Sequence, residues 1–143
     1  MGPIYESALD RSRQLACTGV LESNGWTVCG TNTLDRWDLT LFKDGVLTAL
    51  AEFKWRDKYY RKYGPLKIDT SKIDSILSMC EKTGLAPILI IQWSDLGYFY
   101  WNCRKGCETG TILRTKPRDV VGEVKETRDP CYVIPLDEFK RFG

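Results

Sequence analysis

Residues 38–55, DLTLFKDGVLTALAEFKW, constrain the fold more than any other segment of the chain. Apolar and polar residues alternate on both sides of Asp44-Gly45, a dipeptide typical of tight turns between antiparallel strands. The pattern predicts a β-hairpin with strands over residues 36–42 and 46–55. The second strand ends in ALAEFKW, where Glu52 and Lys54 stand among apolar residues, so the register of the hairpin decides what these two charged side chains face.

The length of the turn sets that register. A two-residue turn of Asp44-Gly45 would place Asp38 and Glu52 on opposite faces of the hairpin, whereas a three-residue turn that includes Lys43 would place them on the same face. The three-residue turn also gathers the apolar residues of both strands on the other face, so hydrophobic matching favours it. We therefore predict that Asp38, Glu52 and Lys54 share one face. The predicted pairs are Phe42 with Val46 and Asp38 with Leu50.

The remaining segments predict one mixed α/β domain spanning residues 1–143. Helical spacing predicts a first helix over residues 5–23 whose inward residues are Tyr5, Ala8, Leu9, Leu15, Ala16, Val20 and Leu21. A second helix over residues 69–83 would be capped by Thr70 or Ser71 and end at Gly84. The apolar run over residues 86–93 predicts a strand buried on both faces. Further strands are predicted over residues 26–29, 98–103, 111–115 and 131–134, with a short terminal helix over residues 137–142.

The composition excludes several kinds of chemistry. The chain has no histidine, which removes histidine bases and histidine metal ligands. Six cysteines are scattered, and the pair Cys103 and Cys107 lacks the further ligands of a structural zinc site. The longest apolar run is too short to cross a membrane, and the N-terminus lacks the apolar stretch of a signal peptide, so we expect a cytoplasmic protein.

Basic residues concentrate directly after the hairpin. Residues 54–67 carry a net charge of +5, which leaves −3 for the remainder of a chain whose net charge is +2. Tyrosines alternate with these basic residues, a mixture suited to phosphates, bases and sugars of a nucleic acid. A solvated surface loop is the alternative interpretation. The predicted nucleic-acid-binding residues of this segment are Arg56, Lys58, Tyr59, Tyr60, Arg61 and Lys62.

Two carboxylates and a lysine on one face form an oxygen-ligand site for a hard cation. Mg²⁺ fits best, with Mn²⁺ as a substitute, because Mg²⁺ accepts one or two carboxylates and completes its shell with water and substrate phosphate. A bound metal lowers the pKa of its water and offsets charge on a phosphoryl group, and Lys54 would lie near that reaction. The alternative is an ion pair on an exposed strand face, for which Arg36 and Glu52 are available.

Asp38, followed on the next strand by Glu52-Phe53-Lys54, resembles the motif of the PD-(D/E)XK nuclease superfamily, above all its small phage and Holliday-junction-resolvase-like members. The resemblance covers residues 5–93. It implies a restriction-endonuclease-like core of helix, three-stranded meander, helix and strand, to which the C-terminal third adds a β-rich extension. A second Glu-x-Lys at residues 123–125 follows Asp119 too closely to leave room for a hairpin, so we reject it as the site.

The resemblance also implies roles for single residues. Asp38, Glu52 and the backbone carbonyl of Phe53 would be metal ligands, and Lys54 the catalytic lysine. Glu6 of the first helix would be a further metal ligand, and Lys72 of the second helix a further phosphate contact.

These observations predict a Mg²⁺-dependent endonuclease that hydrolyses DNA phosphodiester bonds. Branched or junction DNA is a candidate substrate and a homodimer a candidate assembly, and the sequence does not choose the DNA structure or the oligomeric state. RNA is an alternative substrate. An alternative function is a nucleic-acid-binding module that keeps the nuclease fold without turnover. A third interpretation is a protein-interaction domain with an incidental cluster of charges.

Overall fold

The structure of the chain is a computed structural model, and it describes residues 8–30, 37–57, 64–117 and 124–143. Its helices in these ranges are α1 (Ala8–Ser23) and α2 (Thr70–Thr83), with short 3₁₀ turns η3 (Cys103–Lys105) and η4 (Leu136–Glu138). Its strands are β1 (Trp26–Gly30), β2 (Leu39–Lys43), β3 (Val46–Arg56), β4 (Leu66–Asp69), β5 (Ala86–Trp93), β6 (Gly97–Asn102), β7 (Glu108–Pro117), β8 (Val124–Ile134) and β9 (Lys140–Arg141).

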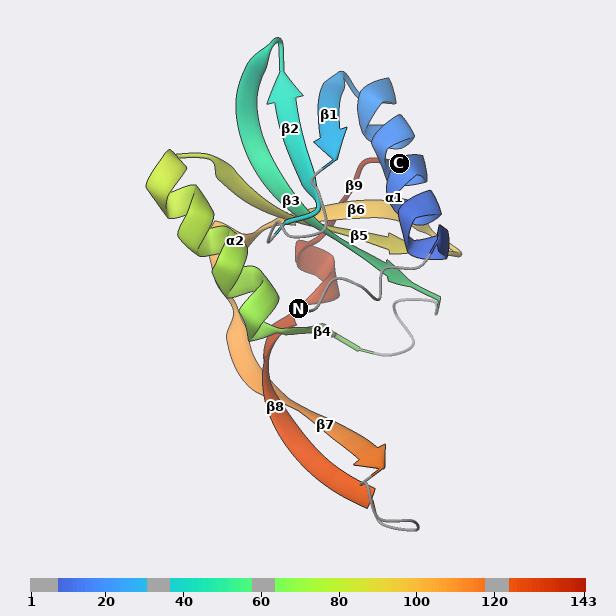
Figure 1. Cartoon of the computed structure of the whole chain (residues 1–143), viewed down its shortest axis with the longest axis vertical. Helices are drawn as coiled ribbons and strands as arrows, with labels where there is room; N and C mark the ends of the chain where they lie inside the picture. The colour runs from blue at the N-terminus through green and yellow to red at the C-terminus, as the bar shows by residue number, and fades with distance from the viewer. Residues whose placement is uncertain (1–7, 31–36, 58–63, 118–123) are drawn as a thin grey trace.

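The strands form two sheets. The larger sheet has the order β1-β2-β3-β5-β6-β9, with β3 and β5 parallel and its other neighbours antiparallel. The smaller sheet has the order β4-β8-β7, and the hairpin of β7 and β8 extends away from the rest of the molecule (Figure 1). No helix in the described ranges is long and apolar enough to span a membrane.

Two apolar clusters cover the two faces of the larger sheet. One packs Cys17 and Leu21 of α1 against Ala51 and Phe53 of β3. The other packs α2 and the smaller sheet against Leu50 of β3 and the same face of β5. Because side chains alternate along β3, its odd-numbered residues from 49 to 55 face α1 and its even-numbered residues face α2. The strand is therefore covered on both sides.

The hairpin of β2 and β3 forms, but its turn differs from the prediction. Lys43 pairs with Val46 across a two-residue turn, in which Asp44 and Gly45 have φ angles of 50° and 78°. Such turns match the right-handed twist of the strands. The register then shifts between Leu41 and Phe42, which leaves one extra residue in β3 as a bulge. The predicted pairs, Phe42 with Val46 and Asp38 with Leu50, are therefore wrong.

The predicted faces are nevertheless correct. The shorter turn moves the register by one residue, and the bulge moves it by one more in the same direction, so the original alternation is restored. Leu39 pairs with Ala51, and the backbone N–H of Asp38 donates to the carbonyl of Ala51 at 2.9 Å. Asp38 thus lies level with Glu52 rather than diagonal to it.

The orientation of α1 differs from the prediction. Leu9 and Leu15 are 56% and 72% exposed, and Ala8 and Ala16 are exposed as well, whereas Cys17 and Leu21 are buried. The guanidinium of Arg13 lies 3.5 Å from the ring centroid of Trp55, a cation–π contact that lets a charged residue occupy the inward face. The expected inward residue Tyr5 lies outside the described residues.

The ends of other elements also depart from the prediction. The N-cap residue of α2 is Asp69, whose side chain makes no capping hydrogen bond, so the predicted cap at Thr70 or Ser71 is wrong. The predicted end of the helix at Gly84 is confirmed. Instead of a helix over residues 137–142, the chain forms η4 and β9. Phe139 is buried there against Trp93, with ring centroids 5.9 Å apart, and this anchor favours an extended chain over a helix.

The orientation of α1 predicts unequal costs for two leucine substitutions. Leu21→Ala should lower the free energy of unfolding by about 2–5 kcal/mol because it opens a cavity under the helix. Leu15→Ala should change it by less than about 0.5 kcal/mol because that side chain is in water. Urea denaturation of both variants measures the difference, and a larger loss for Leu15→Ala would contradict the described orientation.

Candidate active site

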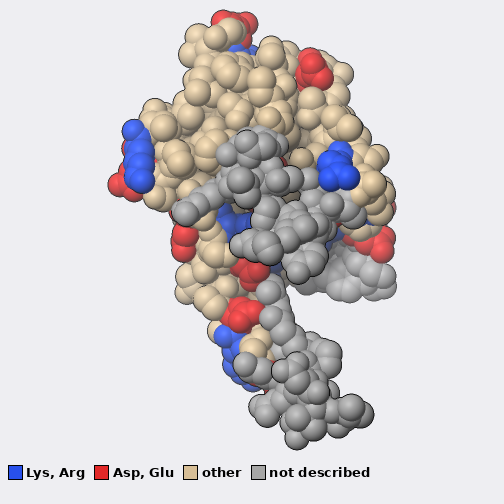
Figure 2. All heavy atoms as spheres, viewed as in Figure 1, with Lys and Arg blue, Asp and Glu red and all other residues tan. Residues whose placement is uncertain are grey.

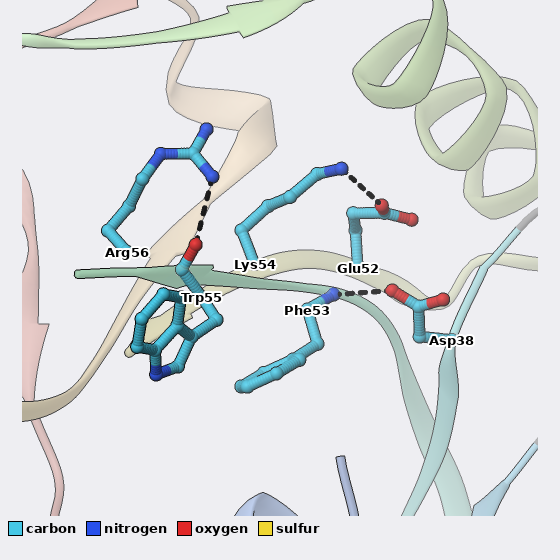
Figure 3. Close-up of polar contacts among 6 residues, drawn as sticks. All are labelled: Asp38, Glu52, Phe53, Lys54, Trp55 and Arg56. Carbon is cyan, nitrogen blue, oxygen red and sulfur yellow. Dashed lines mark hydrogen bonds and ion pairs between the residues drawn. The ribbon is translucent and has the colours of Figure 1, made fainter. Parts of the chain in front are cut away.

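Three charged residues form a row along β3 on the face that looks toward α2. Glu52, Lys54 and Arg56 are alternate residues of the strand, so they project to the same side, while Phe53 and Trp55 project to the other (Figure 3). In the parallel neighbour β5, their register partners are the buried apolar residues Leu89, Ile91 and Trp93. The row therefore stands beside an apolar floor.

Asp38 joins this row from the segment that precedes β2. Its Oδ2 accepts a hydrogen bond from the backbone N–H of Phe53 at 2.8 Å, and its own backbone N–H donates to Ala51. Two hydrogen bonds thus hold Asp38 against β3 on either side of Glu52. The carboxylates of Asp38 and Glu52 lie next to each other as a result (Figure 3), as the alternation predicts.

The carboxyl of Glu52 is in an unusual environment. It is 3% exposed, and its pKa is raised to about 7, first by burial and then by the charge of Asp38. The positive charges of Lys54 and Lys72 lower the pKa of Glu52 and so offset part of this increase. The Nζ of Lys54 lies 3.7 Å from Oε2 of Glu52, and the Lys54 side chain is 29% exposed, so it extends from the buried carboxylate toward solvent.

Two adjacent carboxylates beside an apolar floor repel each other when both are ionised, and a bound cation would relieve that repulsion. Their oxygens are the hard donors that Mg²⁺ prefers. Within the described ranges, no group of three or more His, Cys, Asp or Glu residues could hold a metal ion. The donor set therefore fits an ion that takes two carboxylates and completes its shell with a backbone carbonyl, water or substrate, and it does not fit a structural zinc. Cys103 and Cys107 are free thiols.

The other predicted site residues divide into two groups. Lys72 lies in the first turn of α2, and its charge acts on the pKa of Glu52, so the structure brings Lys72 toward the site. Arg56, predicted as part of a basic loop, instead belongs to β3; the spacing 52, 54, 56 was the signal that could have placed it there. Outside the described residues lie Glu6, Arg36, Lys58, Tyr59, Tyr60, Arg61 and Lys62.

Surface charge by itself does not locate a nucleic-acid interface. On the face drawn in Figure 2, the blue side chains of the described Lys and Arg residues lie in separate places, and several of them lie next to red Asp or Glu side chains. No continuous basic patch is visible among the coloured residues of this face. The features that indicate a site are therefore the row along β3 and Asp38.

The chain matches the model of a protein family described as "Phage putative PDDEXK endonuclease" over residues 1–142. Among solved structures it is similar to Hjc, a Holliday junction resolvase from the archaeal hyperthermophile Archaeoglobus fulgidus. That match has a TM-score of 0.58 and 10% sequence identity, and it covers 88% of this chain and 84% of Hjc. At this identity the likeness shows the fold, and the predicted restriction-endonuclease-like core is confirmed. No curated protein matches the chain.

The burial of Glu52 predicts how stability depends on pH without a divalent ion. A carboxyl whose pKa is raised to about 7 in the folded state resists ionisation, so stability should fall as the pH rises from about 4.5 to above 7. The loss should reach about 3 kcal/mol. Glu52→Gln should remove most of it.

Urea denaturation in EDTA at pH 5 and pH 8 tests this expectation. The matched control is Glu81→Gln, which removes the charge of an exposed glutamate on α2 and should retain the dependence of the unsubstituted protein. If the free energy of unfolding falls equally between pH 5 and pH 8 in Glu52→Gln and in the unsubstituted protein, Glu52 is not held in its neutral form.

Proposed function

Because the chain belongs to the phage PDDEXK endonuclease family, we propose that it is a metal-dependent nuclease that hydrolyses phosphodiester bonds of DNA. One observation carries the proposal: the carboxylates of Asp38 and Glu52 and the ammonium of Lys54 meet on one face of β3 beside an apolar floor. An ordinary strand face would leave such charges in water, whereas here Glu52 is almost fully buried.

In this proposal, Asp38, Glu52 and the backbone carbonyl of Phe53 hold Mg²⁺, for which Mn²⁺ can substitute. When bound, the ion supplies an activated water and offsets charge on the phosphoryl group. Asp38 needs little reorganisation to act as a ligand, because its hydrogen bond from the Phe53 N–H already fixes the carboxylate. Burial favours the neutral form of Glu52, and ion binding should shift this residue toward its ionised form.

Lys54 is proposed to act on the substrate side of the site. Its stem lies beside buried Ile91, while part of the side chain reaches solvent. The ammonium can thus donate to the attacking water or to an oxygen of the scissile phosphate, and it stabilises negative charge that grows there. The ion pair with Glu52 keeps the ammonium at this place before substrate binds.

The basic segment that follows β3 is proposed to bind the DNA backbone. Lys58, Tyr59, Tyr60, Arg61 and Lys62 follow Arg56 closely in the sequence, and Lys72 approaches the site from α2. We propose that residues 1–143 act as one domain in the cytoplasm. RNA is the alternative substrate.

Branched DNA is the substrate class to test first, because the fold is similar to that of a Holliday junction resolvase. Resolution of a junction needs two paired cuts, and a homodimer would supply two sites for them. This part of the proposal rests on the likeness of folds alone.

Cleavage assays with duplex, branched and single-stranded DNA, in Mg²⁺, Mn²⁺ or EDTA, test the proposal. Glu52→Ala and Lys54→Ala should each reduce the cleavage rate by at least about 10²-fold, because the first removes a ligand of the proposed ion and the second removes a positive charge at the reacting phosphate. Binding of DNA should be largely retained.

The matched controls are Glu81→Ala and Lys82→Ala, which remove the same two residue types from an exposed part of α2. Cleavage by Glu52→Ala at the rate of the unsubstituted protein would show that the site is elsewhere. Metal-independent retardation of intact DNA would instead support a binding module without turnover.

A further inference from the structure

Arg56 occupies the third position of the row on β3. It lies two residues after Lys54, just as Lys54 lies two residues after Glu52, and all three side chains project from the same face of the strand (Figure 3). Alternate residues of a strand lie roughly 6.6 Å apart, because each residue advances the strand by about 3.3 Å. One step along this row is comparable to the step between neighbouring phosphates of a polynucleotide strand.

The guanidinium of Arg56 is a half-buried cation without a carboxylate partner in the described part of the chain. Its Nη1 donates to the carbonyl of Trp55 at 3.0 Å, a neutral acceptor that leaves the positive charge uncompensated. Its register partner on β5 is buried Trp93, and burial lowers the pKa of the guanidinium. A partly desolvated charge without a counter-charge is costly, so this position is suited to an anion that arrives from outside.

The end of β3 holds Arg56 in place. The carbonyl of Arg56 accepts from the backbone N–H of Ser94 at 2.9 Å, and the Ser94 hydroxyl donates to the carbonyl of Asp57 at 2.9 Å. On the opposite face, Arg13 stacks on Trp55. The guanidinium therefore projects from a fixed strand end, as a group that selects the position of a ligand should.

Building on the proposed function, we propose that Arg56 binds the phosphate next to the scissile one on the same strand, so that the substrate backbone runs along β3. A guanidinium has five N–H donors, and one nitrogen of Arg56 is used by Trp55, so donors remain for two phosphate oxygens. Lys54 then lies at the scissile phosphate, with Asp38 and Glu52 on one side of it and Arg56 one step along the row on the other. A phosphodiester whose neighbour on that side is missing or neutral should be a poor substrate.

The test replaces single phosphates by neutral methylphosphonates, one at a time on each side of a mapped cleavage site. Arg56→Met should slow single-turnover cleavage of the unmodified strand by about 10–100-fold, as expected for a lost bond between charged groups. One methylphosphonate next to the cut should slow the unsubstituted protein by a similar factor and have no further effect on Arg56→Met. Arg56→Lys should recover part of the rate and of the sensitivity.

Arg104→Met is the matched control, because Arg104 also donates to backbone carbonyls, those of Cys80 and Leu85 at the end of α2. It should keep the full sensitivity to the methylphosphonate. If the loss of cleavage rate from Arg56→Met and the loss from the methylphosphonate multiply at every position, the inference is overturned. An unchanged cleavage rate for Arg56→Met would overturn it as well.

Affinity for the same oligonucleotides, measured by fluorescence anisotropy in EDTA, separates this inference from the proposed function. If the unsubstituted protein does not cleave, the proposed function fails, but non-additive losses of affinity at one modified position would still assign a backbone phosphate to Arg56. Additive losses of affinity would overturn that assignment.

Discussion

The hydrogen bond from the backbone N–H of Phe53 to the Asp38 carboxylate, at 2.8 Å, is the interaction on which the site depends. It joins the two arms of the hairpin at the point where their charged residues meet. Asp38 lies before β2 begins at Leu39, and this bond ties its side chain to β3. With it, one carboxylate is held in place beside another that is buried against the floor formed by β5.

The burial that makes Glu52 costly also makes it useful. Leu89 and the rest of the apolar floor remove water from one side of the row, so each charge there acts on its neighbours more strongly than it would on an exposed strand. Lys54 offsets part of the repulsion between the carboxylates, and a divalent ion would offset more. We therefore propose that the charges of this row are less costly when an ion or a phosphate binds beside them.

Local patterns predicted much of the fold, because β3, β5 and the end of α2 at Gly84 each have a strong signal in a few residues. The face shared by Asp38 and Glu52 was predicted correctly although the turn was not, because a shorter turn and a bulge together keep the alternation. The rotation of α1 could not be predicted, because it depends on a contact between Arg13 and Trp55, which are 42 residues apart in the sequence. The position of Arg56 in the row depended on where β3 ends.

The proposed ion site can be tested by a crystal structure of the protein grown with Mn²⁺, with an anomalous difference map. We expect an anomalous peak that is coordinated by the carboxylates of both Asp38 and Glu52, on the face of β3 that looks toward α2. A peak bound elsewhere, or an Asp38 side chain on the α1 face of the sheet, would contradict it.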